Sequence, residues 1–219
     1  MIETNSSREG FFTIALNRPD KANALTAGMI AQLIAAVRAA VDGGARAIVL
    51  TGRGRVFSAG ADLEAARAGL ATSPLWEELS GAIASAPALT IAALNGTAAG
   101  GALGMVLACD LRIAVPGARL FYPVMKLGFL PQPSDPARLA ALVGPARAAM
   151  ILMAGQRIEA ETALAWGLLD RSARGADGHG RGPGARRAGG QRGSRRRDQA
   201  DDPGRLRLRN RRAGSRASR

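Results

Sequence analysis

Two short glycine-containing segments carry the most informative chemistry in the sequence. FSAGAD spans residues 57–62 and NGTAAGGALG spans residues 95–104, with one expected helix and one expected strand between them. Each segment places small residues where a strand is expected to end and a helix to begin. Backbone N–H groups at such points lack partners within the helix and can donate to an anion. Two such donors that converge on one oxygen would form an oxyanion hole, which stabilises developing negative charge.

Close packing of a helix on a sheet is the alternative explanation for these glycines, because a missing side chain lets backbones approach. Either segment alone would favour packing, whereas four segments in order are more specific. They are LNRPDKANAL at 16–25, VFSAGADL at 56–63, ALNGTAAGGALG at 93–104 and ACDLRIA at 108–114. Together they closely resemble the crotonase, or enoyl-CoA hydratase/isomerase, superfamily. The resemblance extends over roughly residues 10–170.

The resemblance implies which groups hold a ligand. It places the two oxyanion-hole amides on Ala61, after the glycine of SAGAD, and on Gly101, the second glycine of AAGGA. The implied ligand is an acyl-coenzyme A thioester, so coenzyme A is expected as part of the substrate, with no permanently bound cofactor and no metal. The residues implied in coenzyme A binding are Lys21, Ala22, Ala24, Asp62 and Leu63. For the first of these, contact with a phosphate and plain solvent exposure are both open.

The sequence departs from the hydratase pattern at the two positions that serve water addition. In hydratases one glutamate stands three residues after the oxyanion glycine, and a second follows a proline ahead of a Leu-Gly pair. Gly104 and Val124 occupy these places. Hydration needs a carboxylate to activate water and an acid to protonate the α-carbon, and neither residue can do either. A lyase or isomerase of this family and a non-catalytic acyl-CoA-binding protein are therefore both open.

Few other polar side chains could take over proton transfer. Tyr122, Gln132 and Asp135 lie in the segment that the resemblance assigns to the acyl pocket. Because Asp135 precedes Pro136, capping of a helix is favoured over catalysis for this carboxyl. AAGGALG also resembles the aryl-CoA dehalogenase branch, whose aspartate nucleophile would fall at Gln132, three residues before Asp135. Dehalogenation is therefore not supported.

Three glutamates lie after the first glycine segment. Glu64 follows it directly, and the adjacent Glu77 and Glu78 are expected on a solvated face of a later helix. Glu64 therefore stays open as a replacement acid, whereas Glu77 and Glu78 are not favoured.

Strands that alternate with helices position these segments. Aromatic and branched residues predict strands at 11–16, 45–52 and 89–96, and shorter strands at 111–115 and 118–122. Helical spacing after Thr26, a plausible N-cap, predicts a helix that ends near Gly43. Further helices are predicted at 74–85, 100–109, 137–143, 146–153 and 159–169. This alternation indicates an α/β domain, and the resemblance implies a crotonase-like spiral of repeated strand–strand–helix turns.

The basic charge of the chain lies almost entirely at its C-terminal end. Residues 1–170 hold 14 Lys and Arg against 13 Asp and Glu, whereas residues 171–219 hold 16 Arg against 4 Asp. From residue 172 on, two leucines are the largest apolar side chains, so this segment is expected to be disordered. The sequence therefore predicts an acyl-CoA-binding domain at 1–171 and an Arg/Gly-rich tail at 172–219.

Two explanations are open for this tail. A frameshift near residue 172 in a G+C-rich gene would produce Arg, Gly, Ala, Pro and Ser without Lys, as the segment shows. A genuine Arg/Gly-rich RNA-binding tail is the alternative, but it would lack the aromatic residues that stack on bases. Nucleic acid is therefore the less favoured partner.

The sequence also indicates a location and an assembly. The single cysteine, Cys109, excludes an internal disulfide and fits a reducing cytoplasm. Residues 88–109 carry no charge over a length near the roughly 20 residues of a membrane span, but their internal glycines favour a strand, a turn and a buried helix. No secretory signal is recognisable at the N-terminus. A cytoplasmic protein outside the membrane is expected, and the resemblance implies a trimer or a dimer of trimers.

Overall fold

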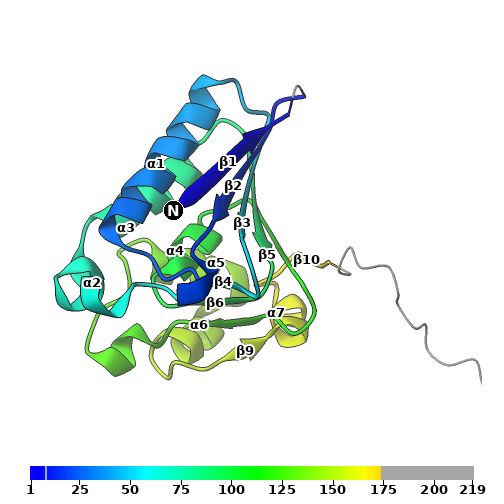
Figure 1. Ribbon diagram of the computed structural model, residues 1–219. Coiled ribbons are helices and arrows are strands. Elements are labelled where there is room, and N and C mark those ends of the chain that lie inside the picture. Colours follow the sequence, from blue (N-terminus) through cyan, green and yellow to red (C-terminus); the bar gives the residue numbers. More distant parts are fainter. Residues whose placement is uncertain (8, 174–219) are drawn as a thin grey trace, which may run out of the picture. The chain divides into compact units, whose positions relative to one another are not determined.

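Two β-sheets form the framework of the part of the chain that the computed structural model describes, residues 1–7 and 9–173. The larger sheet has the strand order β1-β2-β3-β5-β7-β10, and the smaller has the order β4-β6-β8-β9 (Figure 1). The strands of the larger sheet are β1 (Ile2–Ser6), β2 (Phe11–Leu16), β3 (Ala47–Gly52), β5 (Leu89–Leu94), β7 (Leu111–Ala114) and β10 (Arg171–Ser172). Those of the smaller sheet are β4 (Val56–Ser58), β6 (Thr97–Ala99), β8 (Arg119–Phe121) and β9 (Ile158–Glu159).

The chain runs through the two sheets in repeated strand–strand–helix units. β3, β5 and β7 lie in the larger sheet, and each leads into a strand of the smaller one, namely β4, β6 and β8. The helices that follow are α2 (Leu63–Arg67) with α3 (Leu75–Ala84), then α4 (Ala102–Leu107), then α5 (Asp135–Val143) after a short 3-10 turn, η3 (Pro123–Leu127). Neighbouring units pair in parallel, β3 with β5 and β5 with β7. The predicted spiral is confirmed.

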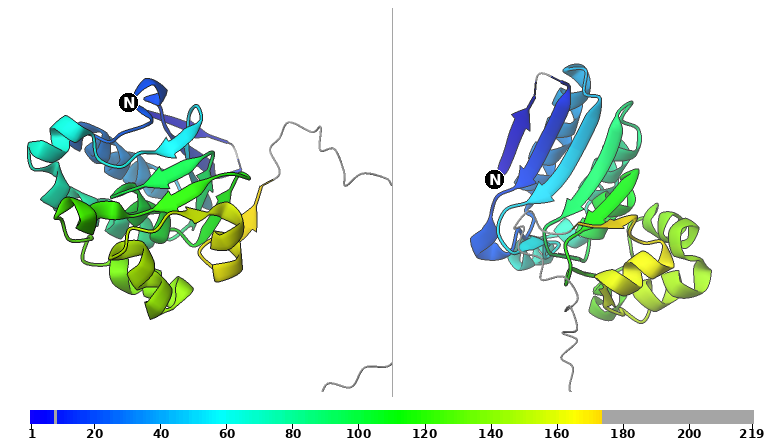
Figure 2. Two further views of the ribbon diagram at one scale, coloured as in Figure 1. Left: turned by 90° about the horizontal axis from the view of Figure 1, so that it is seen from below. Right: turned by 90° about the vertical axis from the view of Figure 1, so that its right-hand side faces the viewer.

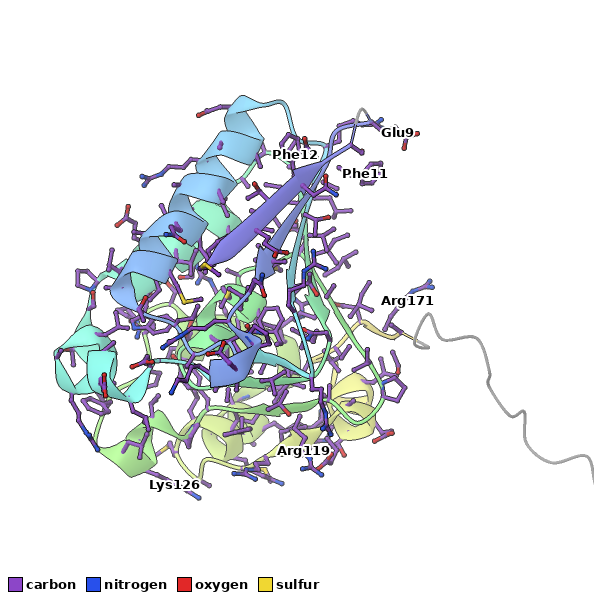
Figure 3. All side chains as sticks on the ribbon, viewed as in Figure 1. Glu9, Phe11, Phe12, Arg119, Lys126 and Arg171 are labelled. Atoms are coloured by element: carbon purple, nitrogen blue, oxygen red, sulfur yellow. The ribbon has the colours of Figure 1, made fainter. Side chains whose placement is uncertain are left out.

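One face of the larger sheet is covered by α1 (Ala27–Asp42), as both views in Figure 2 show. The Thr26 side chain accepts a hydrogen bond from the Met29 amide at 3.3 Å, which confirms the predicted N-cap. Alternating side chains of β2 point to opposite faces, with Phe12 on the side of α1 and Phe11 on the other (Figure 3). Phe11 is 48% exposed, so no helix of the described part of the chain covers that outer face at this point.

Most predicted elements are present, with shorter bounds. The helix predicted at 100–109 is α4, which is only six residues long, because the strand β6 and a turn precede its first residue, Ala102. The C-terminal helices are α6 (Pro145–Leu152) and α7 (Ala160–Trp166). No helix among the described residues is long and apolar enough to cross a membrane. Ser172 pairs with Ala114 in β10, so regular structure extends one residue past the predicted boundary, and the predictions for 174–219 lie outside the described residues.

Candidate functional site

The two glycine segments meet where β4 and β6 end. Gly60 and Gly100 both have positive φ, at 92° and 57°, a region that side chains disfavour. A Cβ on Gly60 would lie 2.8 Å from the Ala99 carbonyl oxygen, and one on Gly100 would lie 3.7 Å from the Gly60 Cα. Glycine at these positions therefore lets the two loops touch backbone to backbone and places them side by side.

A third segment clamps the first glycine loop. The Leu25 amide donates to the Gly60 carbonyl at 2.8 Å, and the Asp62 amide donates to the Leu25 carbonyl at 2.8 Å. Arg18 Nη1 donates to Asp62 Oδ2 at 2.8 Å and to the Ala24 carbonyl at 3.1 Å. This hydrogen bond from Arg18 holds the pKa of Asp62 below its usual range. The position of Ala61 is thus fixed on both sides by its neighbours.

Several amides in these loops have no acceptor within the described part of the chain, and those of Ala61 and Gly101 are among them. On either side of Ala61, the Gly60 amide donates to Ser58 Oγ and the Asp62 amide to Leu25. Before Gly101, the Gly100 amide donates to the Phe121 carbonyl at 3.0 Å. Within the described part of the chain, neither the Ala61 nor the Gly101 amide donates a hydrogen bond to the protein. Since backbone donors are almost always paired, such amides are available to a ligand.

Both residues line one cavity of about 160 Å³. Ala61 and Gly101 contribute to its wall, together with apolar side chains from α2, α3, β8 and the segment around η3. The larger of these side chains are Leu63, Trp76, Phe121, Leu127, Phe129 and Leu130. Polar side chains are scarce among the lining residues, and Gln132 supplies one of them. The cavity therefore suits an apolar group that carries a single acceptor atom.

Of the residues implied in coenzyme A binding, Leu63 lines this cavity, and the others lie on or next to the hydrogen-bonded segments at 18–25 and 59–62. Lys21 is exposed, and Ala22 and Ala24 lie on the segment that hydrogen-bonds to residues 59–62. Leu63 lines the cavity and is 75% exposed. The Asp62 carboxylate accepts from the Glu64 and Ala65 amides at the start of α2, as well as from Arg18. Its side chain is thus occupied by the protein, and its role toward coenzyme A stays a prediction.

The predicted capping role of Asp135 is wrong. Ser134 occupies the cap position of α5, and Asp135 Oδ2 instead accepts a hydrogen bond from the Tyr122 hydroxyl at 2.5 Å. Both side chains are fully buried. Burial raises the pKa of Asp135 to about 6 and raises the pKa of Tyr122 well above its usual range. The carboxyl turns into the protein because a hydroxyl 13 residues earlier in the chain offers a buried donor.

The solvated face predicted for Glu77 is also wrong. Its carboxylate accepts hydrogen bonds from the amide and the hydroxyl of Ser134, so it connects α3 to the start of α5. Glu78 is exposed as predicted and pairs with Arg38 at 2.9 Å. The sequence gives no signal for the contact between Glu77 and Ser134, because these residues are 57 positions apart.

A spiral of strand–strand–helix units around an apolar cavity with two unpaired loop amides is the architecture of the crotonase superfamily. The family model for enoyl-CoA hydratase/isomerase matches residues 6–174. The chain belongs to this family.

Individual relatives agree with this assignment. The chain is 39% identical over 163 residues to the probable enoyl-CoA hydratase EchA6 of Mycobacterium bovis, which covers 74% of this chain and 67% of that protein. It is 35% identical over 173 residues to 4-chlorobenzoyl coenzyme A dehalogenase-2 of an Arthrobacter species, covering 74% and 63%. A crystal structure of enoyl-CoA hydratase from Bacillus anthracis superposes with a TM-score of 0.73 at 31% identity, covering 79% and 70%.

Proposed function

We propose that this protein binds an acyl-coenzyme A thioester and polarises its carbonyl group between the backbone amides of Ala61 and Gly101. The observation that carries the proposal is the pair of amides without acceptors in the wall of one apolar cavity. Family membership supports the choice of a thioester as the ligand. The apolar walls suit an acyl chain, and the two donors suit its carbonyl oxygen.

Two N–H donors at the carbonyl oxygen would draw electron density away from the thioester carbon. Such a preorganised pair stabilises the negative oxygen of an enolate or of a tetrahedral adduct more than it stabilises the neutral carbonyl. The α-protons of the acyl group become more acidic as a result. Coenzyme A would arrive as part of the substrate, with Lys21, Ala22, Ala24, Asp62 and Leu63 as the residues proposed to hold it.

Non-catalytic acyl-CoA binding is the second candidate. It is favoured by Gly104 and Val124, which replace the two carboxylates that the hydratase resemblance implies. In this case the amide pair would hold the thioester without chemical change. A lyase or isomerase requires another group for proton transfer.

Calorimetric titration of the full-length protein with crotonyl-CoA tests the proposal, beside assays of hydration and isomerisation with the same sample. We expect saturable binding with one thioester per chain and no binding of free coenzyme A at the same affinity, because the acyl group fills the cavity. Binding with turnover supports the enzyme, and binding without turnover supports the second candidate. The absence of binding would contradict both.

A further inference from the structure

A carboxyl group from another helix packs against Gly104, where other residues would carry a side chain. Gly104 lies three residues after Gly101 on α4 and is buried. A Cβ at this position would lie 3.1 Å from both carboxyl oxygens of Asp135, which is the first residue of α5. The missing side chain and the inward-turned carboxyl therefore depend on one another. A carboxyl group thus stands where the side chain of residue 104 would begin.

The two oxygens of this carboxyl differ in their partners. Oδ2 accepts from the Tyr122 hydroxyl, whereas Oδ1 is buried and, among the described residues, has no hydrogen-bond partner. An unsatisfied buried acceptor costs free energy of about 1–3 kcal/mol. Its presence calls for an explanation other than stability. One oxygen is oriented by the protein, and the other is free to take a proton.

We propose that Asp135 is the proton-transfer residue of the site, with Oδ1 accepting a proton from the α-carbon of the bound acyl thioester. The inference rests on the proposed function. In this step the α C–H bond breaks and its electron pair forms a C=C bond to the carbonyl carbon. The C=O π pair moves to the oxygen, which becomes an enolate held by the amides of Ala61 and Gly101. Return of the proton from Asp135 reverses the step, so no oxidant or co-reactant is needed.

In this proposal, the acyl group reaches Asp135 past the segment around η3. The carboxyl is fully buried, but Gly101 and Gln132, whose carbonyls accept from the Gly104 and Asp135 amides at 3.1 and 3.0 Å, both line the cavity. The Gln132 amide reaches the Tyr122 hydroxyl only at 3.4 Å, so this part of the wall is weakly held. Contact with the α-carbon requires the acyl group to displace Gln132. Catalytic contacts of this kind commonly form only in the substrate complex.

The charges around Asp135 suit a base that works near neutral pH. Burial raises its pKa to about 6, the Tyr122 hydroxyl and Arg138 of α5 lower it, and Glu77 of α3 raises it. The backbone of α4 at Gly104 brings no charge. Tyr122, whose own pKa is raised by burial and then by Asp135, stays a donor. The carboxyl is therefore mainly ionised at pH 7 and still more basic than an exposed aspartate.

Exchange of α-protons in D2O tests the proposal directly. The full-length protein is incubated with but-3-enoyl-CoA, whose α-protons are acidified by the neighbouring double bond, and deuterium uptake is followed by mass spectrometry. We expect uptake by the wild type, rising with pH and levelling off above about pH 6. Asp135→Asn should reduce the rate at least about 100-fold and keep the affinity for the thioester within about threefold. Glu161→Gln, an exposed carboxyl on α7, should leave the rate unchanged.

A second variant, at Gly104, changes the surroundings of the Asp135 carboxyl. Gly104→Ala places a methyl group against both oxygens and should slow exchange at least about tenfold, whereas Gly81→Ala, which meets no atom within 4 Å, should not. Exchange that is equal in wild type and Asp135→Asn would overturn the proposal. So would a wild type that binds the thioester in calorimetry without any exchange. Absence of binding would instead refute the proposed function on which it rests.

Discussion

In the proposed site, Ala61 and Gly101 act through their backbone amides, so a substituent on either Cα matters only for the space that it fills. A Cβ on Gly101 would lie 3.2 Å from three atoms of the Trp76 indole ring. The ring has little freedom to move, because Trp76 is buried and its Nε1 donates to the Leu70 carbonyl at 2.8 Å. Position 101 therefore requires glycine for packing as well as for its amide.

Gly101→Ala should weaken both stability and binding. Overpacking of this kind costs about 1–3 kcal/mol, and the displaced indole would intrude on the cavity. We expect a lower midpoint of thermal unfolding and an acyl-CoA affinity reduced at least about tenfold in calorimetry. Gly81→Ala, in α3, where an added Cβ meets no atom within 4 Å, is the matched control: it should not lower the midpoint and should leave the affinity unchanged. Unaltered affinity in Gly101→Ala would show that the ligand does not use this wall.

Asp135 makes the stability of the protein depend on pH. Its pKa is about 6 when folded and 3.8 ordinarily, so between about pH 4 and pH 6 the folded protein holds a proton that the unfolded chain has lost. The contribution of this group is therefore fully present below that window and is lost as pH rises through it. At about 1.4 kcal/mol per pKa unit, the loss amounts to at most about 3 kcal/mol.

Asp135→Asn should abolish this dependence. From about pH 4 to about pH 7, the midpoint of thermal unfolding of the wild type should fall relative to that of the variant. Differential scanning calorimetry of both proteins across this range measures the difference. A constant offset between them would mean that the buried carboxyl titrates as it does in the unfolded chain.

At the scale of elements, the side chain of Asp62 connects α2 to the loop before it. Asp62 caps this five-residue helix by accepting from the Glu64 and Ala65 amides, and it receives Arg18 from the preceding segment. Ala61 precedes the cap directly. Anything that releases the start of α2 should therefore release one amide of the proposed site.

Asp62→Ala should lower stability by about 1 kcal/mol through loss of the cap, and it should weaken acyl-CoA binding severalfold. Glu78→Gln removes an exposed ion pair with Arg38 and serves as the control, since such pairs contribute about 0–1 kcal/mol. Urea unfolding and calorimetry report the two effects separately. Loss of stability without loss of affinity would disprove the link between the cap and the site.

Sequence patterns predicted the elements that have strong hydrophobic periodicity, such as β2, β3, β5 and α1. They missed β1, because the sequence of Ile2–Ser6 is mostly polar and gains its regularity from antiparallel pairing with β2. The glycine segments were found because they are continuous in sequence. The contact of Asp135 with Tyr122 and Gly104 was not found, because it joins three elements and leaves no local pattern.

At the scale of the whole molecule, every residue of the proposed site lies within the unit Met1–His179. The match to EchA6 spans 67% of that protein, so the activity of the complete relatives is not transferred by similarity alone. The trimer implied by family resemblance stays a prediction, which sedimentation velocity can test. The two units differ in charge, so we expect them to bind different ligands.

Deletion of residues 180–219 should leave acyl-CoA affinity within about threefold, because the cavity and both amides belong to the first unit. The same deletion should remove any salt-dependent binding of RNA, because residues 180–219 hold 14 Arg against 3 Asp. Calorimetry with crotonyl-CoA and a filter-binding assay at two salt concentrations compare the two proteins. Loss of thioester binding on deletion would place part of the site in the second unit.

The carbonyl stretch of a bound thioester labelled with 13C at the carbonyl carbon tests the central claim most directly. Isotope-edited infrared spectra should show a shift to lower wavenumber on binding, because two amides withdraw electron density from the oxygen. Ala61→Pro removes one donor and should abolish most of the shift, whereas Ala61→Gly keeps the amide and should preserve it. A bound thioester whose carbonyl stretch equals that in water, or an equal shift in the Ala61→Pro variant, would contradict the account.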